Sequence, residues 1–151
     1  MIKVYPIAYI ANDYNIAKND KFISINNALM CDLTGQVCAE SLGFDQFSGT
    51  GGQLDFVRGA GMSTGGKSFI AFRSVAKKKD GMLISRITSV LPPGAVVTTP
   101  RTDVQYVVTE YGIAELRNKS FSERAKALIN IAHPQFRENL LKEARQYQLI
   151  I

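Results

Sequence analysis

The sequence has few of the residues that bind metals. It contains two cysteines, Cys31 and Cys38, and a single histidine, His133. The two cysteines do not have the spacing of a zinc knuckle, and no second pair exists. One histidine also argues against a His-based metal centre and against a Ser-His-Asp relay. We therefore expect no metal site and two reduced thiols.

Long apolar runs are also missing. No stretch of about 18 consecutive apolar residues is present, so no membrane-spanning helix is expected. The sequence shows no recognisable signal peptide. We expect a cytoplasmic protein with no membrane partner.

Positive charge is present but is not concentrated. The formal net charge is +5, and the longest basic run is the three lysines at 77–79. A nucleic-acid-binding surface usually has a basic stripe interleaved with aromatic side chains, and this sequence has none. An anionic small molecule fits the charge at least as well, so we expect no nucleic-acid partner.

The composition is that of an ordinary globular domain, with 46% hydrophobic and 21% charged residues. No repeat or linker divides the chain, so we predict one domain over residues 1–151. Strand-like runs fill the first two thirds and helical spacing fills the last third, which predicts an α/β fold. The predicted strands span residues 3–10, 22–26, 28–33, 36–40, 67–72, 82–90, 95–99 and 106–109.

Two helices are predicted at the end of the chain. Ser120 and Glu123 have the S-x-x-E spacing of a capping box. Pro134 suits the first position of a second helix, and His133 before it suits a cap. The expected apolar faces are Ala125, Leu128, Ile129 and Ala132 in the first helix, and Phe136, Leu140, Leu141 and Ala144 in the second.

The most informative segment is glycine-rich. Gly49, Gly51 and Gly52 precede a run predicted to begin a helix at residues 54–58. Glycine lets the main chain approach a ligand and present its N–H groups. The positive end of a helix dipole would add to the attraction of a phosphate or an oxyanion. The alternative is a tight strand-to-helix turn with no ligand.

Two nucleotide-binding motifs match only in part. Gly59 and Gly61 begin a G-x-G-x-x-G fingerprint, but Thr64 stands where the third glycine belongs. Residues 61–68 satisfy G-x-x-x-x-G-K-[ST], yet residues 68–72 have the pattern of a strand where a phosphate-binding loop needs a helix. We interpret both matches as accidental.

An ordered series of segments is more specific than any of these motifs. It comprises SINNAL at 24–29, DLTGQV at 32–37, FSGTGGQLDFVRG at 47–59, VVTTPRTDV at 96–104, YVVTEYGIA at 106–114, RAKALI at 124–129 and IAHP at 131–134. Together these closely resemble the C-terminal domain of the acetyl-CoA hydrolase/transferase family. The resemblance covers nearly the whole chain and is strongest to 4-hydroxybutyrate and butyrate:acetate CoA-transferases.

That resemblance implies a CoA-transferase fold related to ribose-phosphate isomerases, with a mixed, mainly parallel sheet and C-terminal helices. It also implies a ping-pong reaction in which coenzyme A is a substrate and no cofactor is held permanently. A glutamate attacks an acyl-CoA thioester (4-hydroxybutyryl-, butyryl- or acetyl-CoA). The CoA then rests on the enzyme as a glutamyl thioester until a short carboxylic acid takes it.

The resemblance also implies roles for individual residues. The main-chain N–H of Gly52 would stabilise the tetrahedral oxyanion, a contribution of about 3 kcal/mol for one donor. Gly51 and Gly52 would belong to the CoA site, which Leu29 would contact. Lys77 would meet the anionic part of CoA, although a solvated charge in a polar turn is an equally good interpretation.

One departure from the family pattern is important. The family's nucleophilic glutamate lies in an H-[TS]-E motif upstream of the segment with which this chain begins, and nothing here matches it. Glu40 and Glu110 suit caps, turns or salt bridges, and Asp55 and Arg58 suit an (i, i+3) pair.

We therefore expect the C-terminal domain of a transferase without its N-terminal half, inactive alone, and associating with that half or as a homodimer. The alternatives are a non-catalytic CoA- or nucleotide-binding module and a purely structural interaction domain.

Overall fold

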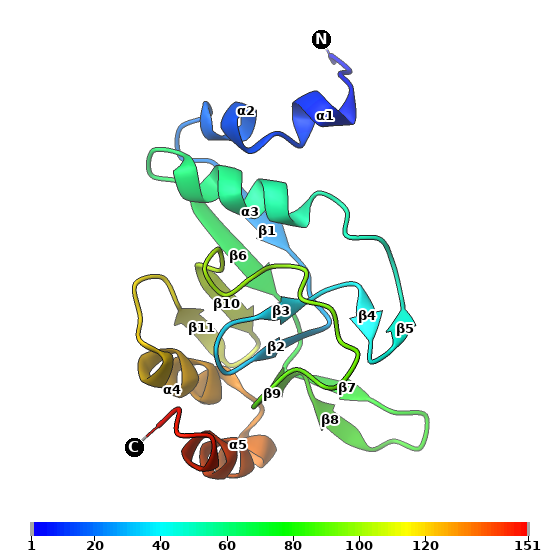
Figure 1. Ribbon diagram of the computed structural model, residues 1–151, viewed down its shortest axis with the longest axis vertical. Coiled ribbons are helices and arrows are strands. Elements are labelled where there is room, and N and C mark those ends of the chain that lie inside the picture. Colours follow the sequence, from blue (N-terminus) through cyan, green and yellow to red (C-terminus); the bar gives the residue numbers. More distant parts are fainter. Residues whose placement is uncertain (1, 151) are drawn as a thin grey trace.

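The chain folds around a four-stranded sheet. The computed structural model describes residues 2–150 of the chain. The strands are β1 (Ile23–Asn26), β6 (Lys67–Ala71), β10 (Tyr106–Thr109) and β11 (Gly112–Glu115), in the order β1-β6-β10-β11. The first three are parallel and β11 is antiparallel to β10 (Figure 1). The sheet is therefore mixed and mainly parallel, as the sequence predicted. The ends of the predicted domain, residues 1 and 151, lie outside the described residues.

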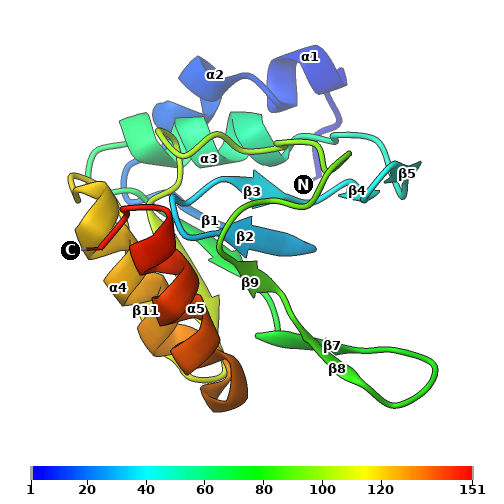
Figure 2. The same cartoon turned by 60° about the horizontal axis from the view of Figure 1, so that its bottom comes forward.

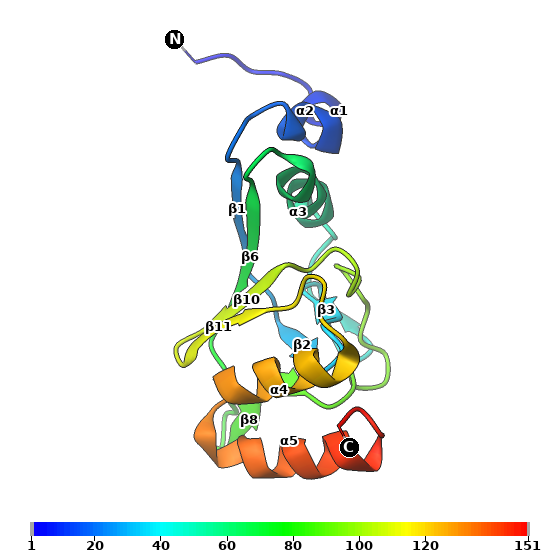
Figure 3. The ribbon, with the colours of Figure 1, turned by 90° about the vertical axis from the view of Figure 1, so that its left-hand side faces the viewer.

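Helices cover one face of this sheet. Helix α3 (Gln53–Met62) packs on β1 and β6, and α4 (Phe121–Ile131) packs on β10 and β11. Helix α5 (Pro134–Gln146) packs on α4. Figure 3 shows α3 on one side of β1 and β6, with no ribbon against their other side. The covered face carries the buried side chains Ser24, Ser68, Ile70, Val107 and Ala114.

A smaller sheet lies beside the first and shares its core. It consists of β2 (Met30–Asp32), β3 (Val37–Cys38) and β9 (Ile87–Thr88), in the order β3-β2-β9. Its side chains join one buried cluster with the helices, including Leu33, Val37, Ile87, Leu116 and Leu128.

Two hairpins project from this part of the chain (Figure 2). They are β4 (Ser41–Leu42) with β5 (Asp45–Gln46), and β7 (Val75–Lys77) with β8 (Leu83–Ser85). The sequence predicted none of the strands β4, β5, β7 and β11. The predicted strand at 82–90 is divided at Arg86 between β8 and β9, which belong to different sheets.

The N-terminal segment differs from its prediction. Residues 3–10 were predicted as a strand, but α1 (Ile7–Ile10) is a short helix with Pro6 at its N-cap. The N–H groups of Tyr9 and Ile10 donate to the main-chain oxygen of Pro6 (N···O 2.9 and 3.2 Å). Proline fixes φ near the helical value and cannot donate to a sheet, so its position favours a helix start. Helix α2 (Asp13–Ala17) follows.

A second prediction is wrong at residues 95–99. This segment forms no strand and makes only an isolated bridge between Thr99 and Val37. The turn predicted before it is present, because the N–H of Ala95 donates to the oxygen of Pro92 (3.0 Å) and Gly94 has φ +81°. The segment is therefore an irregular connection and not a ladder strand, with Val96 and Val97 exposed and Thr98 and Thr99 buried.

The C-terminal helices agree with their predictions. Ser120 and Glu123 form a complete capping box at the start of α4. Pro134 is the first residue of α5, and His133 Nδ1 accepts a hydrogen bond from the N–H of Gln135 (3.3 Å). The predicted apolar faces are buried at Ala125, Leu128, Leu140 and Ala144 and partly buried at Phe136 and Leu141.

Candidate functional site

The glycine-rich segment forms an open loop at the start of α3. Gly51 has φ +59°, a left-handed conformation that glycine adopts without strain, and Gly52 is the N-cap residue of the helix. Within residues 2–150, the N–H groups of Thr50, Gly51 and Gly52 donate no hydrogen bond. The loop is exposed through Gly51. Three consecutive amides at the positive end of a ten-residue helix are thus free for an anion.

A cavity of about 300 Å³ joins this loop to the segment that follows β1. Thr50 and Gln53 lie in its wall on either side of Gly51 and Gly52, and Leu29 lies in the opposite segment. The complete lining is Asn27, Ala28, Leu29, Ala39, Phe47, Ser48, Gly49, Thr50 and Gln53. The cavity lies where β1 ends, and ligands of open parallel sheets bind outside the carboxyl ends of the strands. The structure thus brings Leu29 to the same cavity as Gly49 and Thr50, whereas Gly51 and Gly52, the glycines predicted for the site, are not among its lining residues.

Arg86 fixes the segment that carries Leu29. Its Nε donates to the main-chain oxygen of Leu29 (2.6 Å), and its other guanidinium N–H donates to the oxygen of Ala28. Burial lowers the pKa of Arg86 from its ordinary value, although Glu110 opposes this shift. Arginine stays charged in proteins, so these are charge-assisted hydrogen bonds. Sequence reasoning missed Arg86 because its partners are distant in the chain.

Glu40 fixes the segment that leads into the glycine loop. Its main-chain oxygen accepts from the N–H groups of Phe47 (2.7 Å) and Ser48 (3.1 Å). Its side chain is buried, and Oε1 accepts from Nε2 of Gln46 (3.2 Å). On the other side of the loop, Nε2 of Gln53 donates to Oγ1 of Thr99 (3.0 Å). The main chain of Glu40 thus closes the turn before the glycine loop, whereas Oε2 of its buried carboxylate has no hydrogen-bond partner among the described residues.

Glu110 is also a structural acceptor and does not line the cavity. Its two oxygens accept from the N–H (2.9 Å) and the hydroxyl (2.7 Å) of Ser74. Desolvation by itself would raise the pKa of Glu110. The hydrogen bonds from Ser74 and from its own N–H, together with the charge of Arg73, have the larger combined effect, so the pKa of Glu110 is lowered. The carboxylate thus holds the connection between β6 and β7.

The other charged predictions have different outcomes. Lys77 lies at the exposed end of β7 and does not line the cavity, so its contact with CoA stays a prediction. The pairing predicted between Asp55 and Arg58 is wrong, because Arg58 forms its salt bridge with Asp103 (3.1 Å). Asp103 lies in the loop before β10. It takes the place of Asp55, three residues before Arg58 in the helix, as the partner of this arginine.

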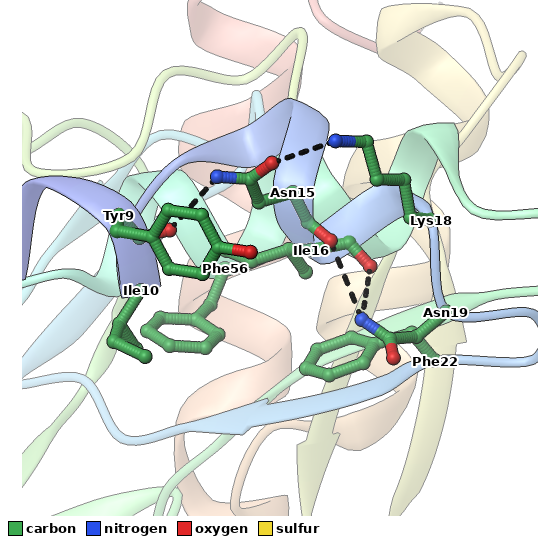
Figure 4. A pocket seen from close by; sticks show the side chains of 8 residues that line it. All are labelled: Tyr9, Ile10, Asn15, Ile16, Lys18, Asn19, Phe22 and Phe56. Atoms are coloured by element: carbon green, nitrogen blue, oxygen red, sulfur yellow. Dashed lines mark hydrogen bonds between the residues drawn. The ribbon is translucent and has the colours of Figure 1, made fainter. Parts of the chain in front are cut away.

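A second cavity, of about 390 Å³, lies between α1, α2 and α3 (Figure 4). Its polar side chains bond to one another and to the main chain: Asn15 Nδ2 donates to the oxygen of Tyr9 (3.1 Å), and Lys18 Nζ donates to Asn15 Oδ1 (2.9 Å). Phe22 and Phe56 form an apolar wall. No residue predicted for the site lies there, so we do not assign it to the site.

The described part of the chain offers no obvious metal centre. Between residues 2 and 150, no group of three or more His, Cys, Asp or Glu side chains is placed to hold an ion. Both cysteines are free and buried, and burial, with a contribution from Asp32, raises the pKa of the Cys31 thiol well above its usual value. In the same residues, no helix has the length and apolar character needed to cross a bilayer.

Known proteins resemble this chain in both sequence and structure. It is 53% identical over 146 residues to the 4-hydroxybutyrate coenzyme A transferase of Clostridium kluyveri, covering 97% of this chain and 33% of that protein. It is 49% identical over 144 residues to the butyryl-CoA:acetate CoA-transferase of Anaerostipes caccae, covering 95% and 32%. The chain thus spans about a third of the length of these curated relatives.

Solved structures show the same fold. RipA from Yersinia pestis superposes with a TM-score of 0.83 at 43% identity, over 96% of this chain and 30% of that one. A 4-hydroxybutyrate CoA-transferase from Porphyromonas gingivalis superposes with a TM-score of 0.74 at 44% identity, over 95% and 31%. The sequence profile of the acetyl-CoA hydrolase/transferase C-terminal domain matches residues 1–144. The chain therefore belongs to the acetyl-CoA hydrolase/transferase family and corresponds to its C-terminal domain.

Proposed function

We propose that this chain forms part of the active site of a coenzyme A-transferase. The reaction moves CoA between an acyl-CoA (4-hydroxybutyryl-, butyryl- or acetyl-CoA) and a short carboxylate through a glutamyl-CoA thioester. The observation that carries the proposal is the cavity in which Leu29 faces a glycine loop whose amides at residues 50–52 have no hydrogen-bond acceptor within the described chain.

The glycine loop suits the developing charge of this reaction. Attack of the glutamate carboxylate on the thioester places a negative charge on the carbonyl oxygen, and collapse of that intermediate expels the CoA thiolate and leaves an acyl-glutamyl anhydride. The thiolate then attacks the glutamyl carbonyl, which releases the acyl group as its carboxylate and forms the glutamyl-CoA thioester. The N–H of Gly52 at the N-terminus of α3 is the donor that we assign to this oxygen. One such donor is worth about 3 kcal/mol, which is about a hundredfold in rate.

The opposite wall suits the CoA arm. Leu29 offers an apolar surface to the pantetheine chain, and Arg86 holds its main chain from behind. Lys77 is assigned to the anionic end of CoA. Its place on an exposed hairpin also suits an ordinary solvated charge, and Lys77→Ala distinguishes the two because only the first predicts weaker CoA binding.

The attacking carboxylate comes from outside these residues in our proposal. The only histidine, His133, precedes proline, so the sequence contains no H-[TS]-E motif. The relatives are about three times as long as this chain. We therefore expect the 151 residues alone to catalyse no transfer.

A chimera tests the proposal directly. In it, this chain replaces the corresponding third of the Clostridium kluyveri relative, and CoA transfer from butyryl-CoA to acetate is measured beside the isolated chain. We expect transfer by the chimera only, with CoA found on a glutamate of its N-terminal part by mass spectrometry.

Two results would contradict this assignment. One is robust exchange by the isolated chain, which would mean that the nucleophile lies within it. The other is a folded chimera that binds CoA in calorimetry but transfers none, which would favour a non-catalytic CoA-binding module.

A further inference from the structure

Two peptide groups at the start of the glycine loop have their oxygens held by side chains. Nε2 of Gln46 donates to the main-chain oxygen of Ser48 (2.7 Å), and the hydroxyl of Ser48 donates to the oxygen of Gly49 (3.1 Å). The N–H groups of the same two peptide groups belong to Gly49 and Thr50, which line the cavity. Within residues 2–150 neither N–H donates a hydrogen bond. The oxygens are thus anchored, and the amides are left free.

Anchoring the oxygen of a peptide group also sets the direction of its N–H. In a planar trans peptide the C=O and N–H bonds point to opposite sides. The bond from Gln46 to the oxygen of Ser48 therefore directs the N–H of Gly49 away from Gln46. The bond to the oxygen of Gly49 directs the N–H of Thr50 in the same manner.

Glu40 holds Gln46 in the position from which it reaches Ser48. Gln46 lies at the end of β5, from which the chain runs to the start of α3 (Figure 1). Its Nε2 carries two hydrogens, and it donates to Oε1 of Glu40 (3.2 Å) as well as to the oxygen of Ser48. Gln46 is exposed, so without this acceptor its side chain would regain rotamer freedom and hold Ser48 less often.

The carboxylate of Glu40 does not favour the fold by itself. Its side chain is buried, with 5% of the residue surface exposed, and Oε2 has no hydrogen-bond donor within residues 2–150. A buried acceptor without a donor lowers stability. An apolar side chain of similar size would avoid that cost but would lose the bond to Gln46. The contribution that only an oxygen at this position can make is therefore the anchor for Gln46.

We infer that Glu40 and Gln46 are positioning residues for the glycine loop. Through the main-chain oxygen of Ser48 they hold the amides at the start of the loop in the direction that leaves them free for an anion. The effect on catalysis rests on the transferase function proposed above, whereas the effect on the direction of the amides does not.

Residual dipolar couplings, which report the direction of each N–H bond, test the inference in the isolated chain. We expect the couplings of Gly49 and Thr50 to change in Gln46→Leu and in Glu40→Leu. The double variant should change them no further, because Glu40 acts through Gln46. Glu40→Gln keeps an oxygen that can accept from Gln46 and should retain the couplings of the unmodified chain.

The chimera gives the catalytic readout. In Gln46→Leu and Glu40→Leu we expect kcat to fall about tenfold with little change in the KM for acyl-CoA, because the loop amides are misdirected while the opposite wall is intact. Glu40→Gln should recover most of the loss. The urea midpoint of Glu40→Leu should be no lower than that of the unmodified chain, since the variant removes an unpaired buried oxygen.

Asp45→Leu is the matched control. Asp45 precedes Gln46 on β5, is also exposed, and directs its side chain to the other face of the strand. It should leave the couplings and kcat unchanged.

The inference is overturned if the couplings of Gly49 and Thr50 are the same in Gln46→Leu as in the unmodified chain, or if Asp45→Leu changes them as much. Altered couplings with an unaltered kcat in an active chimera would overturn the catalytic part. Altered couplings beside an unmodified chimera that transfers no CoA would support the positioning of the amides and refute the transferase assignment instead.

Discussion

Helix α3 lies between two glycine-rich turns that use glycine for different purposes. In the turn that follows the helix, the N–H of Gly66 donates to the oxygen of Ser63 (3.0 Å), and the Ser63 hydroxyl donates to the oxygen of Asn19 (2.6 Å). In the loop that precedes it, the amides at residues 50–52 donate to no group among residues 2–150. Both turns contain a left-handed glycine, Gly51 with φ +59° and Gly65 with φ +71°.

The two turns differ in the space that surrounds their glycines. A Cβ on Gly66 would collide with the main-chain oxygen of Ala60 and lie 2.7 Å from Cβ of Ser63, so glycine there permits close approach of backbone to backbone. A Cβ on Gly51 would meet nothing within 4 Å, so glycine there leaves the space open. The residues that satisfy a phosphate-loop pattern, 61–68, belong to the packed turn, which explains why that match is accidental.

The largest effect is expected at the packed turn. Gly66→Ala should lower the free energy of unfolding by about 2–4 kcal/mol, because the methyl group overlaps atoms of α3 that have no room to move. Urea denaturation of the isolated chain measures this. A loss below about 0.5 kcal/mol would show that the turn is not tightly packed and would remove the contrast with the open loop.

At the open loop, Gly51→Ala should lower catalysis more than stability. Alanine at a left-handed position costs about 1–2 kcal/mol, and the relaxation of that strain would reorient the amides of residues 50–52. In the chimera, we expect kcat to fall by up to about 100-fold, since one oxyanion donor is worth about 3 kcal/mol. Gly65→Ala is the control because it has similar strain, with its Cβ 3.5 Å from the Lys21 side chain, and is outside the site. Equal kcat values for the two variants would contradict the binding role of the loop.

Arg86 extends the comparison to the opposite wall. Arg86→Ala leaves the main-chain oxygens of Ala28 and Leu29 without their donor, a cost of about 1–3 kcal/mol when the groups are buried. In the chimera the KM for acyl-CoA should rise by more than kcat falls, with partial recovery in Arg86→Lys. A fall in kcat alone, with KM unchanged, would mean that Leu29 does not position CoA.

The smallest effect concerns pH. The pKa of Glu110 is lowered in the folded chain, so its stabilisation is present above the unfolded carboxyl pKa of about 4.3 and is lost as pH falls through the lower folded value. Between about pH 5 and pH 3, stability should therefore fall less in Glu110→Gln than in the unmodified chain. The Ser74 hydroxyl can still pair with an amide, so the two should otherwise unfold similarly. Identical pH profiles would show that Glu110 is not held by Ser74.

Local signals predicted some elements well. The Ser120–Glu123 box and Pro134 predicted where α4 and α5 begin, and the run at 106–109 coincides with β10. These signals are local: a cap, a fixed φ and a buried β-branched run. The prediction of a strand at 95–99 is wrong because Thr99 pairs with Val37 through a single bridge only. Whether such a bridge extends into a ladder depends on the tertiary fold and has no local sequence signal. Residues 3–10 failed because Pro6 was assigned to an edge strand when it suits a helix start equally well.

The site was only partly predictable for the same reason. The motif at 47–59 and the motif at 24–29 pointed to the glycine loop and Leu29, and the structure places Leu29 at one cavity with Gly49 and Thr50 but not with Gly51 or Gly52. Arg86 lies 57 residues from Leu29 within an apparently continuous strand run, so nothing local marks it. Phe47 and Gln53 were inside the quoted motif but had no assigned role until the fold placed them in the wall.

A crystal structure of the chimera with an acyl-CoA bound is the most direct test of the role of the glycine loop. We predict the thioester oxygen at about 2.7–3.1 Å from the main-chain nitrogen of Gly52, with the pantetheine arm against Leu29. A thioester bound away from the loop, with the amides of residues 50–52 bonded to other protein groups, would contradict the account.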